Sequence, residues 1–396
     1  DGPPDELAAS GVSLGVHKLR VTGGEPLVHP QAAKMLSDLA KLREDARPLR
    51  TVLRTSLLAL ALAAGGTAQA QQPLTEIKVS YQPALYWALP FYIATEKGWW
   101  AEVGLKPVFS TFPAGVPQIA AAASKSWDVG GTGSVPAVLG HVRFGIKTIG
   151  VTNDESAGNA LLVRKDVADK ISKAPQSMKG QTIVLTANST GDYAVQSCLK
   201  KYGLSKADVT IKNMGQAEII SAVSSNNADL AGVWAPNIYT LEEKAGAKLL
   251  CSGKDGGVVV PGALIARGDY AEQNPEAVAK FLAVYLRGWK WASTHKAEAI
   301  QMMKKFYEQG GVSISEASMK KEFDTRPTFD LATQLARMDR SRGNSDMDAW
   351  FGQIAIFMRG TGAIQTVPQP TDFITDAYMK RVAADAKLRE FANKSN

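Results

Sequence analysis

Residue types that commonly carry metal and redox chemistry are scarce in this 396-residue chain. It contains two cysteines, Cys198 and Cys251, and four histidines. Two thiols far apart in the sequence do not supply the ligands of an iron–sulfur cluster. His141 and His295, the histidines that follow residue 70, lack the spacing of metal ligands. We therefore expect neither a metal site nor a bound cofactor.

Short catalytic motifs are also absent beyond residue 70. That part of the sequence contains no GxSxG nucleophile elbow and no HExxH metal-binding helix. It also lacks the GxxxxGK[ST] loop that holds nucleotide phosphates. We therefore expect no catalytic residues, which argues against an enzyme and for a binding function.

The apolar run at residues 57–64 is too short to span a bilayer, since a spanning helix needs about 20 residues. Three arginines precede the run, and Ala68-Gln69-Ala70 follows it. A positive segment, an apolar core and a small-x-small site in this order are typical of a secretory signal peptide. We therefore predict a signal peptide over residues 47–70 and a mature chain from about Gln71. The alternative is a buried N-terminal helix.

Residues 1–46 precede this predicted signal peptide. Residues 15–27, with the sequence GVHKLRVTGGEPL, resemble the GGEP segment of radical SAM enzymes, especially the molybdenum-cofactor enzyme of that superfamily. The CxxxCxxC motif that binds the cluster in that superfamily is absent. We interpret residues 1–46 as an upstream fusion or mis-called segment without a role in binding.

Charge and cysteine content bear on the ligand and on the compartment. The formal net charge is +7, and the basic residues are spread along the chain. A spread positive excess suits a small anion better than nucleic acid, which favours clustered basic residues. Cys198 and Cys251 would form one disulfide in an exported protein, or they are two separate buried thiols. The sequence leaves both alternatives open.

The stretch over residues 127–138, WDVGGTGSVPAV, is the most informative one. It predicts a short apolar strand, a glycine-rich turn and the start of a helix. Ser134 suits an N-cap, and Pro136 suits the first helical turn. Free N–H groups and the positive end of a helix dipole at such a junction can hold an anion.

The same order of strand, small polar turn and helix start recurs twice. Residues 183–193 contain Ser189 and Thr190 at the turn, and residues 231–239 contain Trp234 and Pro236. Ligands of α/β proteins lie beyond the carboxyl ends of strands, where loops lead into helices. Three such junctions around one cleft would form an anion site without a catalytic group.

Strands and helices alternate from residue 76 to about residue 265, which predicts parallel α/β layers. Helical spacing of apolar residues dominates from residue 274 onward. Predicted strands near residues 161–164 and 263–267 bracket a middle block. We therefore predict lobe 1 at 75–163 plus 264–396 and lobe 2 at 164–263, with a hinge at the two crossings.

Residues 76–385 resemble the periplasmic solute-binding proteins of sulfonate, taurine and nitrate import, the SsuA/THI5-like family. The motifs that carry the resemblance are Ser80-Tyr81-Gln82, Glu96-Lys97-Gly98, Phe112-Pro113-Ala114-Gly115, Asp128-Val129-Gly130-Gly131-Thr132-Gly133, Ser189-Thr190 and Val233-Trp234-Ala235-Pro236. The resemblance implies a two-lobed type II periplasmic-binding-protein fold with the ligand in the cleft between the lobes. It also implies a monomer in the periplasm that delivers its ligand to the membrane permease of an ABC importer with a cytoplasmic ATPase.

The motif around Trp234 is most similar to taurine-binding members, and the one around Gly133 to alkanesulfonate-binding members. A small organic anion, taurine or an alkanesulfonate, is therefore the expected ligand. Alternatives are nitrate, an aromatic acid or a thiamine pyrimidine precursor. A pyrimidine-synthase-like enzyme is the alternative of another class, although its cysteine-rich iron motif has no counterpart here.

We assign ligand contacts to ten residues. Gln82 is expected to donate to a sulfonate oxygen, and the donors of two helix starts are expected to hold the anion. The aromatic residues would pack on the organic part of the ligand, or else they pack the lobes. The ten are Gln82, Tyr86, Trp87, Thr132, Gly133, Ser134, Ser189, Thr190, Trp234 and Pro236.

Overall fold

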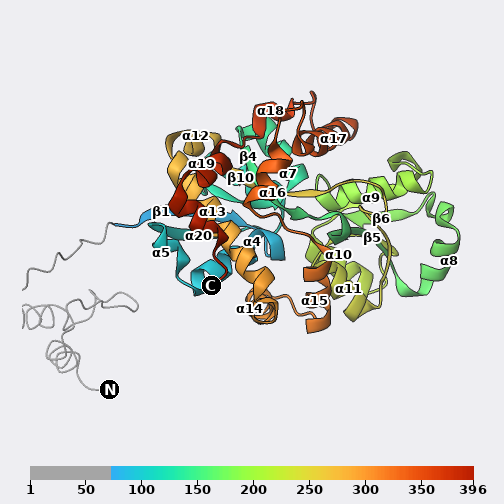
Figure 1. Ribbon diagram of the computed structural model, residues 1–396. Helices are drawn as coiled ribbons and strands as arrows, with labels where there is room; N and C mark the ends of the chain where they lie inside the picture. Colours follow the sequence, from blue (N-terminus) through green and yellow to red (C-terminus); the bar gives the residue numbers. More distant parts are fainter. Residues whose placement is uncertain (1–72) are drawn as a thin grey trace, which may run out of the picture. The chain divides into compact units, whose positions relative to one another are not determined.

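The computed structural model describes residues 73–396. The predicted upstream segment (1–46) and signal peptide (47–70) lie outside the described residues. Residues Gln72–Asn396 form one unit, in which Figure 1 shows two groups of strands, each surrounded by helices. This arrangement confirms the predicted two-lobed α/β architecture.

The first sheet has five strands in the order β2-β1-β3-β10-β4. The strands are β1 (Thr75–Tyr81), β2 (Leu105–Thr111), β3 (Val129–Gly133), β4 (Lys147–Asp154) and β10 (Pro261–Ala266). In β1, Ile77 and Val79 are fully buried, as the alternating pattern predicts. β1 pairs in parallel with β2 and β3, whereas β10 runs antiparallel to β3 and β4. The sheet is therefore mixed and not parallel throughout.

The glycines of residues 130–133 form strand β3 and not the turn that the sequence predicts. Their role is close packing. A Cβ atom on Gly131 would stand 3.0 Å from the Cα and Cβ atoms of Trp87, so only glycine lets the helix that carries Trp87 lie directly on the strand. The next helix, α7 (Ser134–Phe144), begins at once, and its N-cap is Gly133 and not Ser134.

The second sheet has the order β7-β6-β8-β5-β9. Its strands are β5 (Asn159–Val163), β6 (Thr182–Leu185), β7 (Thr210–Asn213), β8 (Leu230–Trp234) and β9 (Lys248–Ser252). β5 lies antiparallel between β8 and β9. The strand pairing therefore assigns residues 159–163 to the second lobe and residues 261–263 to the first, a few residues from the predicted boundaries. The division into domains remains a proposal.

Two segments cross between the sheets, one from β4 to β5 and one from β9 to β10. They are hydrogen-bonded to each other. Glu155 N donates to Val260 O (2.7 Å), and Val260 N donates to Ser156 Oγ (3.0 Å). A paired double connection of this kind is the expected position of a hinge between two lobes.

Helices cover both sheets (Figure 1). Those between the strands are α4 (Leu85–Glu96), α5 (Trp99–Glu102), α6 (Gly115–Ala120), α7, α8 (Ala168–Lys173), α9 (Thr190–Lys201), α10 (Gln216–Ser224) and α11 (Asn237–Ala245). The C-terminal part of the chain is helical, as predicted. It contains α12 (Gly268–Gln273), α13 (Pro275–Thr294), α14 (Lys296–Gln309), α15 (Glu316–Thr325), α16 (Leu331–Met338), α17 (Asp346–Gly360), α18 (Pro370–Phe373), α19 (Ala377–Ala384) and α20 (Ala386–Asn393).

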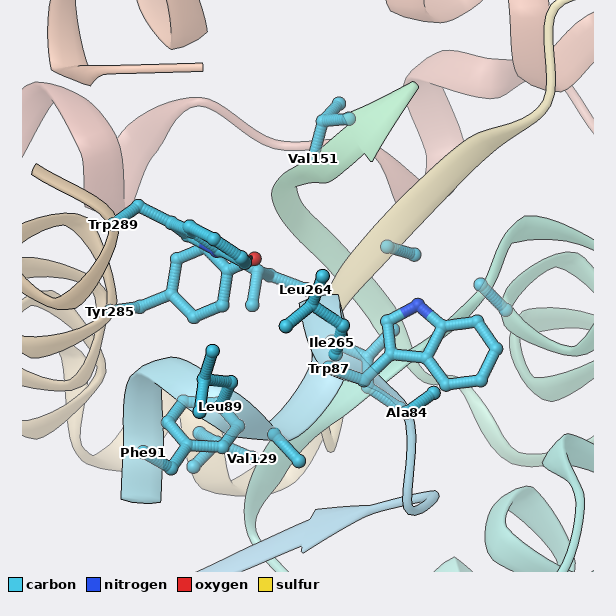
Figure 2. Close-up of a cluster of buried hydrophobic side chains, with 14 of the residues drawn as sticks. Ala84, Trp87, Leu89, Phe91, Val129, Val151, Leu264, Ile265, Tyr285 and Trp289 are labelled. Atoms are coloured by element: carbon cyan, nitrogen blue, oxygen red, sulfur yellow. Dashed lines mark hydrogen bonds between the residues drawn. The ribbon is translucent and has the colours of Figure 1, made fainter. Parts of the chain in front are cut away.

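The main hydrophobic core lies between α4, the first sheet and α13. Figure 2 shows Trp87 and Phe91 of α4, Leu264 of β10 and Tyr285 of α13 within it. The Phe91 and Tyr285 rings pack with centroids 5.6 Å apart. One wall of the cleft, where Trp87 lies, is therefore part of the rigid core of the first lobe.

Cys198 of α9 and Cys251 of β9 form a disulfide in the second lobe, with Cα atoms 5.9 Å apart. Both residues are fully buried in a second, smaller core. This finding decides between the two alternatives that the sequence left open, and a structural disulfide is typical of proteins outside the reducing cytosol.

Candidate functional site

A cleft between the two lobes is lined by helix starts and loops of both sheets. The first lobe contributes Gln82, Trp87, Ala114, Gly115, Val116, Gly133 and Pro136, and the second contributes Thr186, Ala187, Asn188, Ser189, Thr190 and Trp234. Six of the ten predicted contact residues are in this set. None of the lining residues is Asp, Glu, Lys, Arg or His, so the described part of the lining offers neutral groups to a ligand.

The two lobes touch at Gly133 and Thr190. A Cβ atom on Gly133 would stand 2.7 Å from Thr190 Cγ2, so the backbone of one lobe lies against the side chain of the other. The remaining cavity measures about 20 Å³, taken as the volume open to the centre of a water molecule. This is room for about one water. The cleft is therefore closed, and an organic ligand needs the lobes to separate before it enters.

Two helices begin at this contact. α7 starts at Ser134 and α9 at Thr190, with Gly133 and Ser189 as their N-caps. The first N–H groups of each helix have no partner within the helix, and the dipoles place partial positive charge at both ends. The predicted junctions after β3 and β6 therefore do converge on one cleft.

Ser189 is committed to the local structure of α9. Its hydroxyl donates to Thr186 O (2.7 Å) and accepts from Asp192 N (3.1 Å). Asp192 Oδ2 in turn accepts from Asn188 N (3.1 Å). Burial raises the pKa of Asp192. The hydroxyl of Ser189 therefore shapes the loop, and the free backbone donors at this end of α9 are those of Thr190 and Gly191.

Gln82 is 3% exposed, and its amide nitrogen is already engaged. Nε2 donates to Thr132 Oγ1 (2.9 Å) and to Gln118 Oε1. Gln118 Nε2 donates onward to Ser80 Oγ (2.8 Å). The expected donation from Gln82 to a ligand therefore competes with a buried network within the first lobe.

Three other predicted residues, Thr132, Ser134 and Pro236, are outside the lining of the cleft. Thr132 and Ser134 are fully buried and outside the lining. The Ser134 hydroxyl has no hydrogen-bond partner among residues 73–396. Pro236 is the N-cap of α11 and is also outside the lining. The side chain of Tyr86 lies outside the described residues, so its predicted contact stays a prediction.

Trp87 and Trp234 form the aromatic part of the lining and are 2% and 7% exposed. Trp87 Nε1 donates to Glu155 Oε1 (2.6 Å). Trp234 Cε3 would be 3.4 Å from a Cβ atom on Gly191, so its ring packs against the start of α9. The cleft therefore combines two indole rings with the backbone donors of two helix starts.

Sequence reasoning missed the buried carboxyl group that accepts a hydrogen bond from Trp87. Glu155, on the crossing between β4 and β5, is fully buried, and burial raises its pKa to about 7 although Arg326 favours the charged form. Arg326 Nη2 lies 3.8 Å from Glu155 Oε1, and Arg326 Nη1 donates to Glu322 Oε1 (2.9 Å). No local pattern marks Glu155, because two of its partners, Trp87 and Arg326, come from distant parts of the chain.

A larger groove of about 1240 Å³ lies on the second lobe and is open to solvent. Arg164 lines it but is paired with Asp166 and Asp229 (both 2.7 Å). None of the ten predicted residues lines this groove. We therefore assign the candidate site to the smaller cleft between the lobes.

Within residues 73–396, no cluster of three or more His, Cys, Asp or Glu residues is arranged to bind a metal ion. No helix of this range has the length and apolar character needed to cross a bilayer.

Solved structures with the same fold include two periplasmic binding proteins. The periplasmic aliphatic sulphonate binding protein SsuA from Escherichia coli aligns with a TM-score of 0.63 at 18% identity, over 76% of this chain and 92% of that chain. The periplasmic nitrate-binding protein NrtA from Synechocystis PCC 6803 aligns with a TM-score of 0.63 at 13% identity, over 82% and 92% of the two chains. These likenesses establish the fold.

Sequence relatives agree with that fold. A protein of Bacillus subtilis (strain 168) named "Putative aliphatic sulfonates-binding protein" is 29% identical over 244 residues, which are 60% of this chain and 72% of the relative. The taurine-binding periplasmic protein of Escherichia coli (strain K12) is 30% identical over 215 residues, which are 53% of this chain and 64% of the relative. The family model described as NMT1/THI5 like matches residues 88–299, more than half of the chain. The chain therefore belongs to the NMT1/THI5-like family.

Proposed function

We propose that this protein is an extracytoplasmic solute-binding protein that captures a small organic anion, taurine or an alkanesulfonate, for an ABC importer. The observation that carries the proposal is the meeting of two helix N-termini, α7 and α9, in a cleft whose described lining has no ionisable side chain. Backbone N–H groups and helix dipoles stabilise a negative charge without a basic residue.

The character of the lining favours a monoanion with an organic tail. A dianion such as sulfate is more costly to remove from water than a monoanion, and neutral donors compensate that cost less well than a basic side chain would. Trp87 and Trp234 offer apolar surface that a bare inorganic anion cannot use. A sulfonate with at least two carbons satisfies both requirements.

The names of the relatives and structural neighbours support this choice and supply the main alternative. Two relatives are named for aliphatic sulfonates and taurine, and one structural neighbour is named for nitrate. Nitrate is a monoanion, so the helix starts suit it equally well. It lacks an organic tail, however, and leaves the two tryptophan rings without a ligand contact.

Export and delivery complete the proposal. The predicted signal peptide at residues 47–70 would direct the chain to the periplasm, and the Cys198–Cys251 disulfide suits an oxidising compartment. Delivery would require a membrane permease and its cytoplasmic ATPase, because the sequence beyond residue 70 has no phosphate-binding loop of its own. We expect the protein to act as a monomer and without enzymatic activity.

Isothermal titration of a chain that starts at Gln71 tests the ligand. Taurine, ethanesulfonate, nitrate and sulfate are titrated separately. We expect ethanesulfonate or taurine to bind at least about tenfold more tightly than sulfate, a gap of roughly 1.4 kcal/mol. Equal affinity for sulfate and sulfonates would contradict the assignment, and a preference for nitrate would favour the alternative.

A further inference from the structure

Four buried side chains form a hydrogen-bonded chain between the two walls of the cleft. Trp87 Nε1 donates to Glu155 Oε1 (2.6 Å), and Asn159 Nδ2 donates to Glu155 Oε2 (3.3 Å). Thr190 Oγ1 donates to Asn159 Oδ1 (2.8 Å). Trp87 belongs to α4 of the first lobe and Thr190 to α9 of the second, and both line the cleft. Glu155 lies between them on a crossing segment.

The chain requires a carboxylate at its centre. Two donors, the indole N–H of Trp87 and the amide of Asn159, approach the two oxygens of Glu155. A carboxylate accepts at both oxygens, whereas an amide of the same shape accepts at one and donates at the other. A glutamine side chain at this position could therefore accept a hydrogen bond from Trp87 or from Asn159, but not from both.

Glu155 is held in this position from several sides. A Cβ atom on Gly262 would stand 2.3 Å from Glu155 Oε1, so the β10 backbone lies directly against the carboxylate. Arg326 provides an opposite charge 3.8 Å away and also pairs with Glu322. Burying a charged carboxylate is costly, so the contacts of Glu155 indicate a role other than stability.

We propose that Glu155 is a positioning residue of the cleft, which orients Trp87 directly and Thr190 through Asn159 so that the two lobes close correctly on a ligand. The inference rests on the proposed function, because it concerns the same cleft. It adds a residue on the crossing segment that does not line the cleft. Its position lets it couple the approach of the lobes to the orientation of both walls.

An exchange of donor and acceptor groups tests the proposal. Glu155→Gln leaves one donor without an acceptor, and Asn159→Asp places two carboxylates against each other. In the double variant, the introduced amide would accept from Trp87 and donate to the introduced carboxylate, which would still accept from Thr190. We expect each single variant to bind ethanesulfonate at least about tenfold more weakly, a change of roughly 1.4 kcal/mol. The double variant should bind more tightly than either single variant.

Recovery in the double variant is expected to be partial, for one geometric reason. Asn159 Nδ2 also donates to the backbone carbonyl of Glu155 (3.1 Å), and an aspartate cannot replace that bond. A double variant that binds no better than the weaker of the two single variants would overturn the proposal. Wild-type affinity in Glu155→Gln would overturn it as well.

Glu322→Gln is the matched control. It removes a carboxylate from the same buried group, where Glu322 accepts from Tyr307 (2.9 Å) and Arg326 (2.9 Å). In contrast to Glu155→Gln, it leaves the bonds of Trp87 and Asn159 to Glu155 in place. We expect it to bind ethanesulfonate within about threefold of the wild type. An equal loss in both variants would assign the effect to charge and overturn the positioning role.

A readout without ligand separates this inference from the proposed function. The indole N–H signal of Trp87 in a ¹H–¹⁵N spectrum, assigned with Trp87→Phe, reports its bond to Glu155. We expect Asn159→Asp to shift this signal and the double variant to return it toward the wild-type position. If the wild type binds none of the four anions, the proposed function fails. The indole signal still supports or refutes the hydrogen-bonded connection from Trp87 through Glu155 to Asn159.

Discussion

Gly133 and Thr190 belong to different lobes, and a Cβ atom on Gly133 would stand 2.7 Å from Thr190 Cγ2. Gly133 has φ −74° and ψ 158°, which any residue can adopt. A side chain at this position is therefore excluded by the opposite lobe and not by the backbone. The closed cleft therefore leaves no room for a side chain at position 133.

Gly133→Ala is expected to prevent full closure. Overpacking of this kind costs about 1–3 kcal/mol, so ligand affinity should fall roughly tenfold or more. Thr190→Ser removes the clashing methyl group but keeps the hydroxyl that donates to Asn159. Titration of ethanesulfonate should therefore show that Gly133→Ala with Thr190→Ser binds more tightly than Gly133→Ala alone.

Small-angle scattering measures the closure of the lobes in the wild type and in Gly133→Ala. With ligand, the radius of gyration of the wild type should decrease, because the lobes close by a hinge motion. It should decrease less in Gly133→Ala. Unchanged affinity and scattering in this variant would show that the contact does not limit closure.

Ser189→Ala is expected to lower both stability and affinity. Loss of the cap on α9 should reduce the free energy of unfolding by about 1 kcal/mol. Ser345→Ala is the matched control, because Ser345 caps α17 with the same bond to an aspartate three residues later (3.1 Å). Denaturant unfolding should give similar losses for the two variants, whereas only Ser189→Ala should weaken binding of ethanesulfonate. Equal affinities would remove Ser189 from the site.

The Cys198–Cys251 disulfide closes a loop with a sequence separation of 53 residues. In the chain-entropy model, a loop of this length restricts the unfolded chain by about 4 kcal/mol, and measured values are typically 2–4 kcal/mol. We expect the double variant Cys198→Ala with Cys251→Ala to have a free energy of unfolding lower by about 2–4 kcal/mol. A reducing agent should destabilise the wild type and leave the double variant unaffected, since it has no thiol left.

The buried carboxylates predict a pH dependence of stability. Burial raises the pKa of Glu155 from 4.5 to about 7 and that of Glu322 to about 6. Between pH 4.5 and 7 these two carboxyl groups therefore hold more protons in the folded protein than in the unfolded chain. Their contribution to the free energy of unfolding should fall as the pH rises through this window. Glu155 alone should account for about 3 kcal/mol at most.

Comparison with Glu155→Gln isolates this contribution. Arg326 and Asp154 are the charged groups that act on the pKa of Glu155, and Glu155 in turn raises the pKa of Tyr285. These remain in the variant, so the difference between the two unfolding profiles reports Glu155 itself. We expect the free energy of unfolding of Glu155→Gln, relative to that of the wild type, to increase from about pH 5 to about pH 8. A constant difference across this range would contradict a raised pKa.

Patterns along the chain were sufficient for the elements and for three strand-to-helix junctions. The helical spacing predicted from residue 274 onward is observed as helices that begin with α13 (Pro275–Thr294) and α14 (Lys296–Gln309). Such elements follow from the local spacing of apolar residues and from turn and cap residues. Six predicted contact residues also line one cleft, because the ends of β3, β6 and β8 all face it.

Local patterns were insufficient where long-range packing decides. The sequence left open whether Trp87 lines the cleft or packs a lobe, and within α4 it does both, because a glycine of β3 gives it room. The glycines of residues 130–133 looked like a turn, because the sequence does not show which helix packs on them. Gln82 was expected to donate to a ligand, and Thr132 and Gln118, which come from other segments, accept from its amide nitrogen.

The amino-acid sequence by itself determined the order of strands and helices, the glycine and hydroxyl residues at the helix starts, and the family to which the chain belongs. The tertiary structure alone decided that β5 and β10 run antiparallel in their sheets, that Cys198 meets Cys251, and that Glu155 links Trp87 to Asn159. Element formation depends on neighbours within a few residues, whereas strand pairing, disulfide geometry and buried hydrogen bonds depend on residues that only the folded chain brings together.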